Sequence, residues 1–414
     1  MNDVVSFLVI LILTKHQKSP KKFSLAFFRL TIFGWQKSPA IDPRHLDSYP
    51  VEYHTLTVQC VKDLKIKPIM VVCWLLSLAT LIGCQAKDSL GPAVTPSKKY
   101  IDSIVRLDPA MDDLIPVGAV IEKVVGGFEF TEGPVWLPSA DNRLFFSDIP
   151  GNKLYSWSAT SGLTTVLDPV VEPEHATSSH MIGSNGLAIS PAGKLILCEH
   201  GNRRVSQLEL NGDRTTLASH YLGQRLNSPN DIVFHSSGAA FFTDPPYGLE
   251  HGDQDPVKEL THNSVYRLDP NGTLTRLTSA QSRPNGLAFS PDERTLFVSN
   301  SGWPEDALLM RYPVLDDLSL GEGSLFFDTA PLIGQKYTGT PDGLKLDQSG
   351  NIYTTGPGGI LILDPEGRHL GTIKTDEVAA NLGWGDDGST LYITANTSLY
   401  KIKTHAVGLN YRKK

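Results

Sequence analysis

The sequence predicts an all-β fold, a six-bladed β-propeller of four-stranded antiparallel blades, and three observations lead to this prediction. Six similar segments follow one another from about residue 117, their leading residues lie 39 to 57 positions apart, and helical periodicity is nearly absent. Repeats of this length with about four short strands each are typical of propeller blades. Two separate β-sandwiches are the alternative, but they would not explain one recurring unit.

Each repeated segment follows one plan. An Asn, Asp or Glu leads a short apolar strand, a turn rich in Pro, Asp, Ser or Gly follows, and a second apolar strand comes next. Four segments show the plan clearly, and they begin at Asn185, Asn230, Asn285 and Asp342. Weaker copies begin at Glu132 and Asn381. Because the ring must close, we expect a strand near residues 119–124 to pair within the blade that ends at Ile402.

The composition excludes several classes of function. The chain has 414 residues, of which 40% are hydrophobic and 20% charged, as in soluble globular proteins. Residues 1–84 carry ten Lys or Arg and five Asp or Glu, whereas the remainder carries 27 and 39. This acidic body argues against a nucleic-acid partner and fits a cation site or a neutral sugar. Cys198 is the single cysteine of the body, so we expect a buried strand residue there and no disulfide.

The first 116 residues are expected to lie outside the propeller domain, which we place at residues 117–408. Residues 62–84 indicate a bacterial export signal, with three lysines before an apolar run that ends in Leu-Ile-Gly-Cys. This ending resembles the lipobox of bacterial lipoproteins, in which the signal is cut before the cysteine and its thiol receives a diacylglycerol. Cys84 is therefore the expected lipidation site, and an ordinary cleaved signal is the alternative.

The expected export signal lies well inside the chain, where such signals work poorly. We therefore expect translation to start near Val61 or Met70, and residues 1–61 to be a misassigned or disordered extension. Residues 85–116 are expected to form a polar linker. The protein is then exported to the periplasmic side of a bacterial membrane, where only a lipid anchor holds it, or it is free in the periplasm.

Propeller geometry gathers the leading residues of the blades around one axis, because the first strand of each blade lines the central channel. Glu132, Asn230, Asn285 and Asp342 would offer two carboxylates and two amide oxygens there. Such donors suit one divalent cation, Ca²⁺ first, with Mg²⁺, Mn²⁺ and less naturally Zn²⁺ as alternatives. Asn-Gly and Asp-Gly pairs also form turns in any β protein. The recurrence of oxygen donors at the same point of different units favours the site.

Several ordered segments resemble those of the SMP-30/gluconolactonase/luciferin-regenerating family. They are Thr131-Glu-Gly-Pro-Val-Trp136, Pro229-Asn-Asp231, Arg283-Pro-Asn-Gly286 and Thr340-Pro-Asp-Gly343. The segments 198–204 and 244–248 are similar to the bacterial gluconolactonase branch, and the resemblance spans residues 117–404. It implies metal-dependent lactone hydrolysis, such as glucono-1,5-lactone to gluconate. By position it makes Glu132, Asn285 and Asp342 metal ligands, and Asn230 a ligand or a substrate contact at the metal.

The resemblance also implies a mechanism. The cation polarises the lactone, a water attacks the carbonyl carbon, and Asp342 accepts the proton as both ligand and base. A serine nucleophile is not expected, because the sequence has no G-x-S-x-G segment. Candidates for contacts with the sugar are Asn185, His200, Arg225, Asn230 and Tyr247. Loop anchoring is the alternative role for His200 and Tyr247.

Two other functions stay open at this point. The chain could be a non-catalytic propeller that binds a partner or a sugar on its top face, although the complete oxygen set favours an enzyme. It could also act on a different lactone, or on an organophosphate-type ester, at the same metal. The expected partner is a small-molecule sugar lactone, and the rim loops 170–184, 247–262 and 302–340 are expected to select it.

Overall fold

The chain divides into two units, residues 1–89 and residues 90–414. The computed structural model describes residues 9–12, 29–32, 99–100, 103–138, 142–172, 179–302, 306–334 and 338–409. In the first unit, β1 (Val9–Ile12) pairs antiparallel with β2 (Arg29–Ile32). The expected export signal 62–84, including Cys84, lies outside the described residues. Within the described ranges, no helix has the length and apolarity needed to cross a bilayer.

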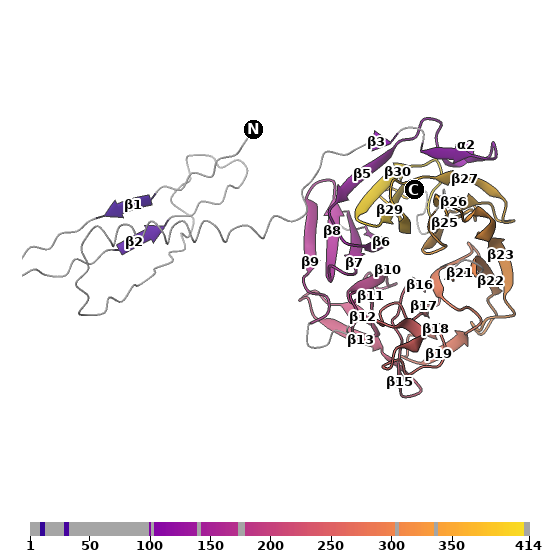
Figure 1. Cartoon of the computed structure of the whole chain (residues 1–414), viewed down its shortest axis with the longest axis horizontal. Helices are drawn as coiled ribbons and strands as arrows, with labels where there is room; N and C mark the ends of the chain where they lie inside the picture. The colour runs from indigo at the N-terminus through magenta and orange to yellow at the C-terminus, as the bar shows by residue number, and fades with distance from the viewer. Residues whose placement is uncertain are drawn as a thin grey trace, which may run out of the picture. The chain divides into compact units, whose positions relative to one another are not determined.

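Six antiparallel sheets form the blades of the second unit and confirm the predicted six-bladed propeller (Figure 1). Four blades have four strands each. The first blade contains β6 (Thr131–Leu137), β7 (Arg143–Asp148), β8 (Lys153–Ser158) and β9 (Gly162–Leu167), and the second contains β10 (Ser184–Ile189), β11 (Leu195–Glu199), β12 (Arg204–Leu208) and β13 (Arg214–Ala218). The third contains β16 (Ile232–Phe234), β17 (Ala240–Asp244), β18 (Ser264–Leu268) and β19 (Leu274–Thr278). The fourth contains β20 (Pro284–Phe289), β21 (Thr295–Ser301), β22 (Ala307–Pro313) and β23 (Ser324–Asp328). The first strand of each blade is innermost and the fourth is outermost (Figure 1).

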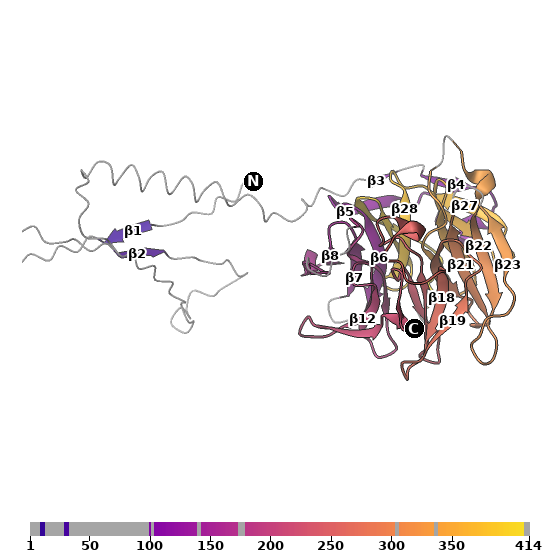
Figure 2. The same ribbon diagram turned by 60° about the horizontal axis from the view of Figure 1, so that its bottom comes forward.

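The fifth and sixth blades each gain strands from the start of the unit. The fifth contains β24 (Leu344–Leu346), β25 (Ile352–Gly356), β26 (Gly359–Leu363), β27 (His369–Ile373) and β4 (Ile104–Arg106); the sixth contains β28 (Ala379–Gly385), β29 (Thr390–Ala395), β30 (Ser398–Lys403), β5 (Ile121–Gly126) and β3 (Lys99–Tyr100). The pairing of β5 with β30 closes the ring, as expected for the strand near 119–124. The blades stand side by side around the ring in the tilted view of Figure 2.

The carboxylate of Glu377 links the two strands that close the ring. Glu377 Oε1 accepts hydrogen bonds from Lys123 Nζ at 3.0 Å, Ser398 Oγ at 2.5 Å and Tyr400 Oη at 2.8 Å. Lys123 belongs to β5, and the other two donors belong to β30. The side chain therefore joins the first strand of the ring to the last.

The folded unit begins earlier than residue 117. β4 pairs with β27, and the short helix α2 (Met111–Leu114) buries Met111 in the apolar cluster of the fifth and sixth blades. Ile115 is also fully buried there. The last residues of the expected linker 85–116 are thus part of the fold, because their apolar side chains cover blades that would otherwise face water.

The cores of the blades lie between neighbouring sheets. The second strands β11, β17 and β29 are buried along their whole length, because each sheet packs against another on both faces. Cys198 is a free cysteine on β11 and is fully buried, as expected for a small strand residue.

Glycines allow the innermost strands to touch near the axis. Gly186 N donates to Asn230 O at 2.7 Å, and Gly286 N donates to Asp342 O at 3.2 Å, in each case across two neighbouring blades. A Cβ on Gly286 would lie 2.3 Å from Asp342 O, so only glycine fits this approach. Both glycines lie within strands, β10 and β20. The glycines of these Asn-Gly pairs therefore allow close contact between neighbouring blades, and they do not form turns.

The smaller elements lie in connections at the rim of the propeller. A short hairpin pairs β14 (His220–Tyr221) with β15 (Gln224–Arg225). Two single turns of 3₁₀ helix, η3 (Gly252–Gln254) and η4 (Ala330–Leu332), lie in long connections. These connections belong to the rim loops that the sequence singles out for substrate selection.

Candidate functional site

The predicted oxygen donors all lie at the start of innermost strands. Glu132 belongs to β6, Asn185 to β10 and Asn285 to β20, while Asn230 and Asp342 lie two positions before the first residues of β16 and β24. Glu132, Asn185, Asn230 and Asn285 are at most 4% exposed, and Asp342 is partly exposed. Five blades therefore contribute one polar side chain each near the axis.

Two of these side chains are carboxylates that influence each other. Burial and the negative charge of Asp231 raise the pKa of Glu132 to about 7, against the hydrogen bonds from Asn381 and Gly133. Burial and the charges of Glu132 and Asp231 raise the pKa of Asp342 well above its ordinary range, although a hydrogen bond with Asn285 opposes this. Like charges gathered in a buried channel destabilise one another, and a bound cation would relieve that repulsion.

The carboxylate of Glu132 is held in place by its neighbours. Its Oε2 accepts hydrogen bonds from Asn381 Nδ2 at 2.9 Å and from Gly133 N at 2.7 Å. Asn381 leads the sixth blade, next to the first, so the adjacent blade orients the carboxylate. Both of these hydrogen bonds are made to Oε2.

The amide of Asn285 is oriented so that its oxygen remains free. Its Nδ2 donates to Ser301 Oγ at 2.9 Å, and Ser301 Oγ donates to Pro341 O at 2.6 Å. Asn285 Oδ1 is buried and finds no hydrogen-bond partner among the residues that the structure describes. Leaving a buried acceptor unpaired is costly, so this oxygen is a candidate ligand for a cation or a substrate group.

Asn185 shows the same arrangement. Its Nδ2 lies 3.2 Å from His200 Nε2, and His200 Nδ1 lies 3.2 Å from Met181 O. A proton on Nδ1 satisfies both contacts, because Nδ1 then donates to the carbonyl and Nε2 accepts from the amide. Asn185 Oδ1 is buried and has no hydrogen-bond partner within the described ranges. His200 is fully buried behind Asn185, so the structure places it as an anchor for that residue.

A pH-dependent contribution to stability follows from His200. Burial lowers the pKa of its imidazole to about 4, from an ordinary value of 6.5. Between these values the unfolded chain binds a proton that the folded chain does not, so stability falls as the pH drops from about 6.5 to about 4. We expect the free energy of unfolding to fall less in His200→Gln than in the wild type over this pH range, by on the order of 3 kcal/mol.

Urea unfolding of the metal-free protein at pH 7.5, 5.5 and 4.5 measures this difference between wild type and variant. His220, which is exposed on the rim hairpin, supplies the matched control His220→Gln, and this control should follow the wild type. Parallel stability curves for wild type and His200→Gln would contradict the neutral, buried imidazole.

The structure brings Tyr247 to the site but ties Arg225 elsewhere. Burial and the charge of Asp342 raise the pKa of Tyr247 to about 12, against hydrogen bonds with Ser301 and Asn285. The Tyr247 hydroxyl therefore lies beside the candidate ligands as a neutral donor. Arg225 Nη2 donates to Asn202 O at 3.2 Å, and the backbone N of Arg225 donates to Glu259 Oε2 at 2.7 Å.

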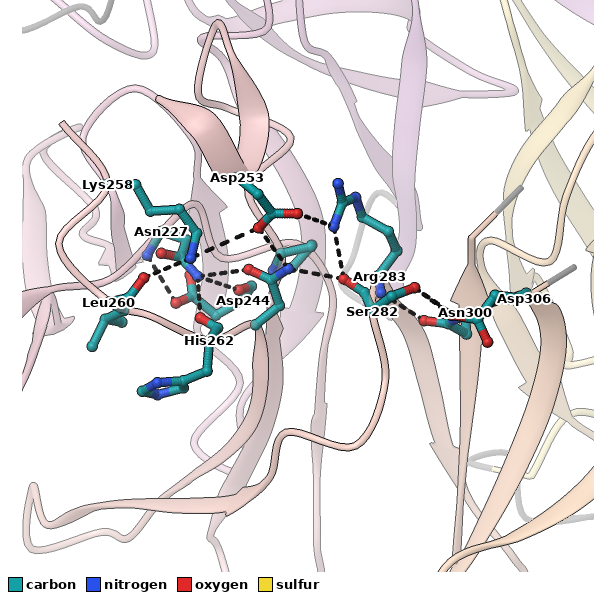
Figure 3. A network of polar contacts seen from close by, with 12 residues as sticks. Asn227, Asp244, Asp253, Lys258, Leu260, His262, Ser282, Arg283, Asn300 and Asp306 are labelled. Carbon is teal, nitrogen blue, oxygen red and sulfur yellow. Dashed lines mark hydrogen bonds and ion pairs between the residues drawn. The ribbon is translucent and has the colours of Figure 1, made fainter. Parts of the chain in front are cut away.

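A network of polar contacts holds the rim loop that follows β17 and carries Tyr247 (Figure 3). The two oxygens of Asp244 accept from Asn227 N and Ser228 N at 2.8 Å each. Farther along the loop, Asp253 accepts from Asn263 Nδ2 at 3.0 Å and pairs with Arg283, which precedes Asn285 by two positions. The loop is thereby fixed against the strand that carries a candidate ligand, which favours a preorganised site.

The donor set fits a hard divalent cation. Within the described part of the chain, no group of three or more His, Cys, Asp or Glu side chains is arranged to hold a metal. The candidate set instead combines the carboxylates of Glu132 and Asp342 with the unpaired amide oxygen of Asn285. All are oxygen donors, which is the preference of Ca²⁺ and Mg²⁺.

Asp231, Lys345 and Asn381 also belong to this region, although the sequence did not single them out as site residues. Asp231 stands where four other repeats have glycine after their leading residue, at positions 133, 186, 286 and 343, and that irregularity is a signal in the repeat itself. Asn381 leads the weakest repeat. Lys345 has no signal in the sequence, because only the fold brings it to the axis.

A family model described as "SMP-30/Gluconolactonase/LRE-like region" matches residues 130–397. The chain belongs to the SMP-30/gluconolactonase/LRE-like family. This membership confirms the resemblance, and it includes all four predicted ligand positions within the matched region.

Relatives in the family include proteins named for lactone hydrolysis. A gluconolactonase of Zymomonas mobilis is 36% identical over 319 residues, which cover 74% of this chain and 88% of that protein. A pentonolactonase of Haloferax volcanii is 26% identical over 271 residues, covering 64% of this chain and 80% of the relative. The solved structure of a gluconolactonase from Xanthomonas campestris is 30% identical, with a TM-score of 0.64, and covers 75% of this chain and 98% of its own.

Proposed function

We propose that this chain hydrolyses a sugar lactone, with glucono-1,5-lactone as the first candidate substrate, and that one divalent cation, Ca²⁺ before the others, serves the reaction. Glu132, Asn285 and Asp342 would hold the cation, and Asn230 would be a fourth ligand or a substrate contact. One observation carries the proposal: two mutually repelling carboxylates and an unpaired, buried amide oxygen occupy equivalent points near the channel axis. The names of the gluconolactonase and pentonolactonase relatives support the substrate class.

The side chains of the site have distinct tasks in this proposal. A bound cation would supply a Lewis acid that polarises the lactone carbonyl. Asp342 accepts the proton of the attacking water, for which a carboxylate with a raised pKa is well suited. Tyr247 remains neutral and donates a hydrogen bond to the substrate. Asn185 Oδ1, unpaired among the described residues, accepts a hydrogen bond from a sugar hydroxyl.

Proton release from glucono-1,5-lactone tests the activity directly. We expect the protein to accelerate hydrolysis over the spontaneous reaction, EDTA to remove the acceleration, and added Ca²⁺ to restore it. A metal count on the purified protein should give one divalent ion per chain. Rates equal to the spontaneous reaction would favour a non-catalytic binding propeller. Activity confined to other lactones or to esters would favour a different substrate at the same site.

We also propose that the protein is exported and attached to a membrane through a lipid on Cys84. The proposal rests on the export-signal pattern of residues 62–84. Labelling of the expressed protein with a radioactive fatty acid should be lost in Cys84→Ala. N-terminal sequencing of the unprocessed precursor locates the start of translation, and a precursor that retains Phe7 would contradict a start near Val61 or Met70.

A further inference from the structure

A third carboxylate lies beside the two candidate ligands. Asp231 is 2% exposed and follows Asn230 in the third blade. Its Oδ1 accepts from Ile232 N at 2.8 Å, while its Oδ2 is buried and receives no hydrogen bond from the described residues. The side chain fills the space that Gly186 leaves open, since a Cβ there would lie 2.7 Å from Asp231 Oδ1. Its charge contributes to the raised pKa values of both Glu132 and Asp342.

One ammonium group faces this carboxylate. Lys345 Nζ lies 3.8 Å from Asp231 Oδ2 and donates a hydrogen bond to Leu344 O at 2.9 Å. Lys345 belongs to β24 in the fifth blade, whereas Asp231 belongs to the third, and the fourth blade stands between them in the ring. The two side chains therefore meet in the central channel. The charge of Lys345 also acts on Glu132, whose pKa it lowers.

The charges of the channel then balance in a specific way. Glu132, Asp231 and Asp342 carry three negative charges when ionised, and Lys345 carries one positive charge. One divalent cation brings the total charge of these ionised groups to zero, whereas a second divalent cation leaves net positive charge in the channel. Uncompensated buried charge is strongly unfavourable.

We propose that Lys345 is a positioning residue of the metal site, whose fixed ammonium charge neutralises Asp231 and so sets both the affinity of the channel for its divalent cation and the limit of one ion. The inference rests on the proposed function, because it assumes that Glu132, Asn285 and Asp342 hold a cation. It goes beyond that function by assigning the charge balance of the site to a pair of side chains that are not ligands.

Calorimetric titration of the metal-free full chain with Ca²⁺ tests the proposal through two variants with opposite expected effects. Asp231→Asn leaves the ammonium of Lys345 unbalanced, and we expect Ca²⁺ affinity to fall at least about tenfold. Lys345→Met leaves an additional negative charge, and we expect Ca²⁺ affinity to rise at least about tenfold, or a second ion to bind. The double variant Asp231→Asn/Lys345→Met removes both charges and should bind one ion with affinity close to that of the wild type. Lys345→Arg keeps the charge and serves as the matched control.

The outcomes separate this inference from the proposed function. If the wild type binds one Ca²⁺ and both single variants bind one Ca²⁺ within twofold of its affinity, the Lys345–Asp231 pair only joins blades and the inference is wrong. If the wild type binds no divalent cation, the metal site itself is wrong. If Lys345→Met does not fold, the comparison of Asp231→Asn with the double variant still tests the inference. A loss of Ca²⁺ affinity in Asp231→Asn that the added Lys345→Met substitution does not reverse would contradict a charge effect.

Discussion

Replacing Asp342 with asparagine should lower kcat for lactone hydrolysis on the order of a thousandfold at saturating Ca²⁺. Asparagine keeps an oxygen that can contact a cation, but it cannot accept a proton from water. We therefore expect the loss in kcat to exceed the loss in Ca²⁺ affinity, which separates the role of Asp342 as a base from its role as a ligand. Proton-release kinetics and calorimetric Ca²⁺ titration on the same preparation measure the two effects.

Asp316 provides the control for this experiment. It is exposed on the outer part of the fourth blade, so Asp316→Asn should keep the activity and the Ca²⁺ affinity of the wild type. An Asp342→Asn protein that retains more than about a tenth of wild-type kcat would show that another group accepts the proton.

Introducing a single methyl group at Gly286 should damage both the fold and the site. A Cβ at this position would lie 2.3 Å from Asp342 O, 2.8 Å from Gly343 Cα and 3.0 Å from Leu344 N. All three atoms are backbone atoms of the neighbouring blade, so no side-chain rotation relieves the clash. We expect Gly286→Ala to lower the free energy of unfolding by about 3 kcal/mol. Ca²⁺ affinity should fall as well, because Asn285 and Asp342 are pushed apart.

Chemical denaturation and Ca²⁺ titration check this expectation, with Gly334→Ala as the matched control. A Cβ on Gly334 meets no atom within 4 Å, so this control should change stability by less than about 0.5 kcal/mol. A Gly286→Ala protein that unfolds like the control would show that the innermost strands can separate without cost.

The repeat made most of the fold predictable. The strand pairs within each blade are local in sequence, so their alternating pattern and turns indicate them directly, and closure of a ring demands the pairing of β5 with β30. The extra strand β4 was not predictable in the same way. Its partner β27 lies more than 260 residues farther along the chain, and nothing in residues 104–106 distinguishes an edge strand from an extended linker.

The candidate site was predictable only where the repeat itself carries the signal. Glu132, Asn285 and Asp342 share one register, and propeller geometry brings that register to the axis. His200 also lies near the expected region, but it supports Asn185 from behind. Lys345 was missed because its alternating neighbours Leu344 and Leu346 indicate an ordinary strand, and only the ring brings its ammonium group across to Asp231.

The ring closure also bears on how this chain is made. Lys123 and Glu377, which fasten β5 to the last blade, are 254 positions apart. A chain that emerges from the ribosome therefore exposes β5 without its partner until synthesis is almost complete. Contacts between such distant segments form slowly, which delays the locked native state. A polypeptide that is still open can pass through a narrow secretion channel, which is what the export proposed above requires.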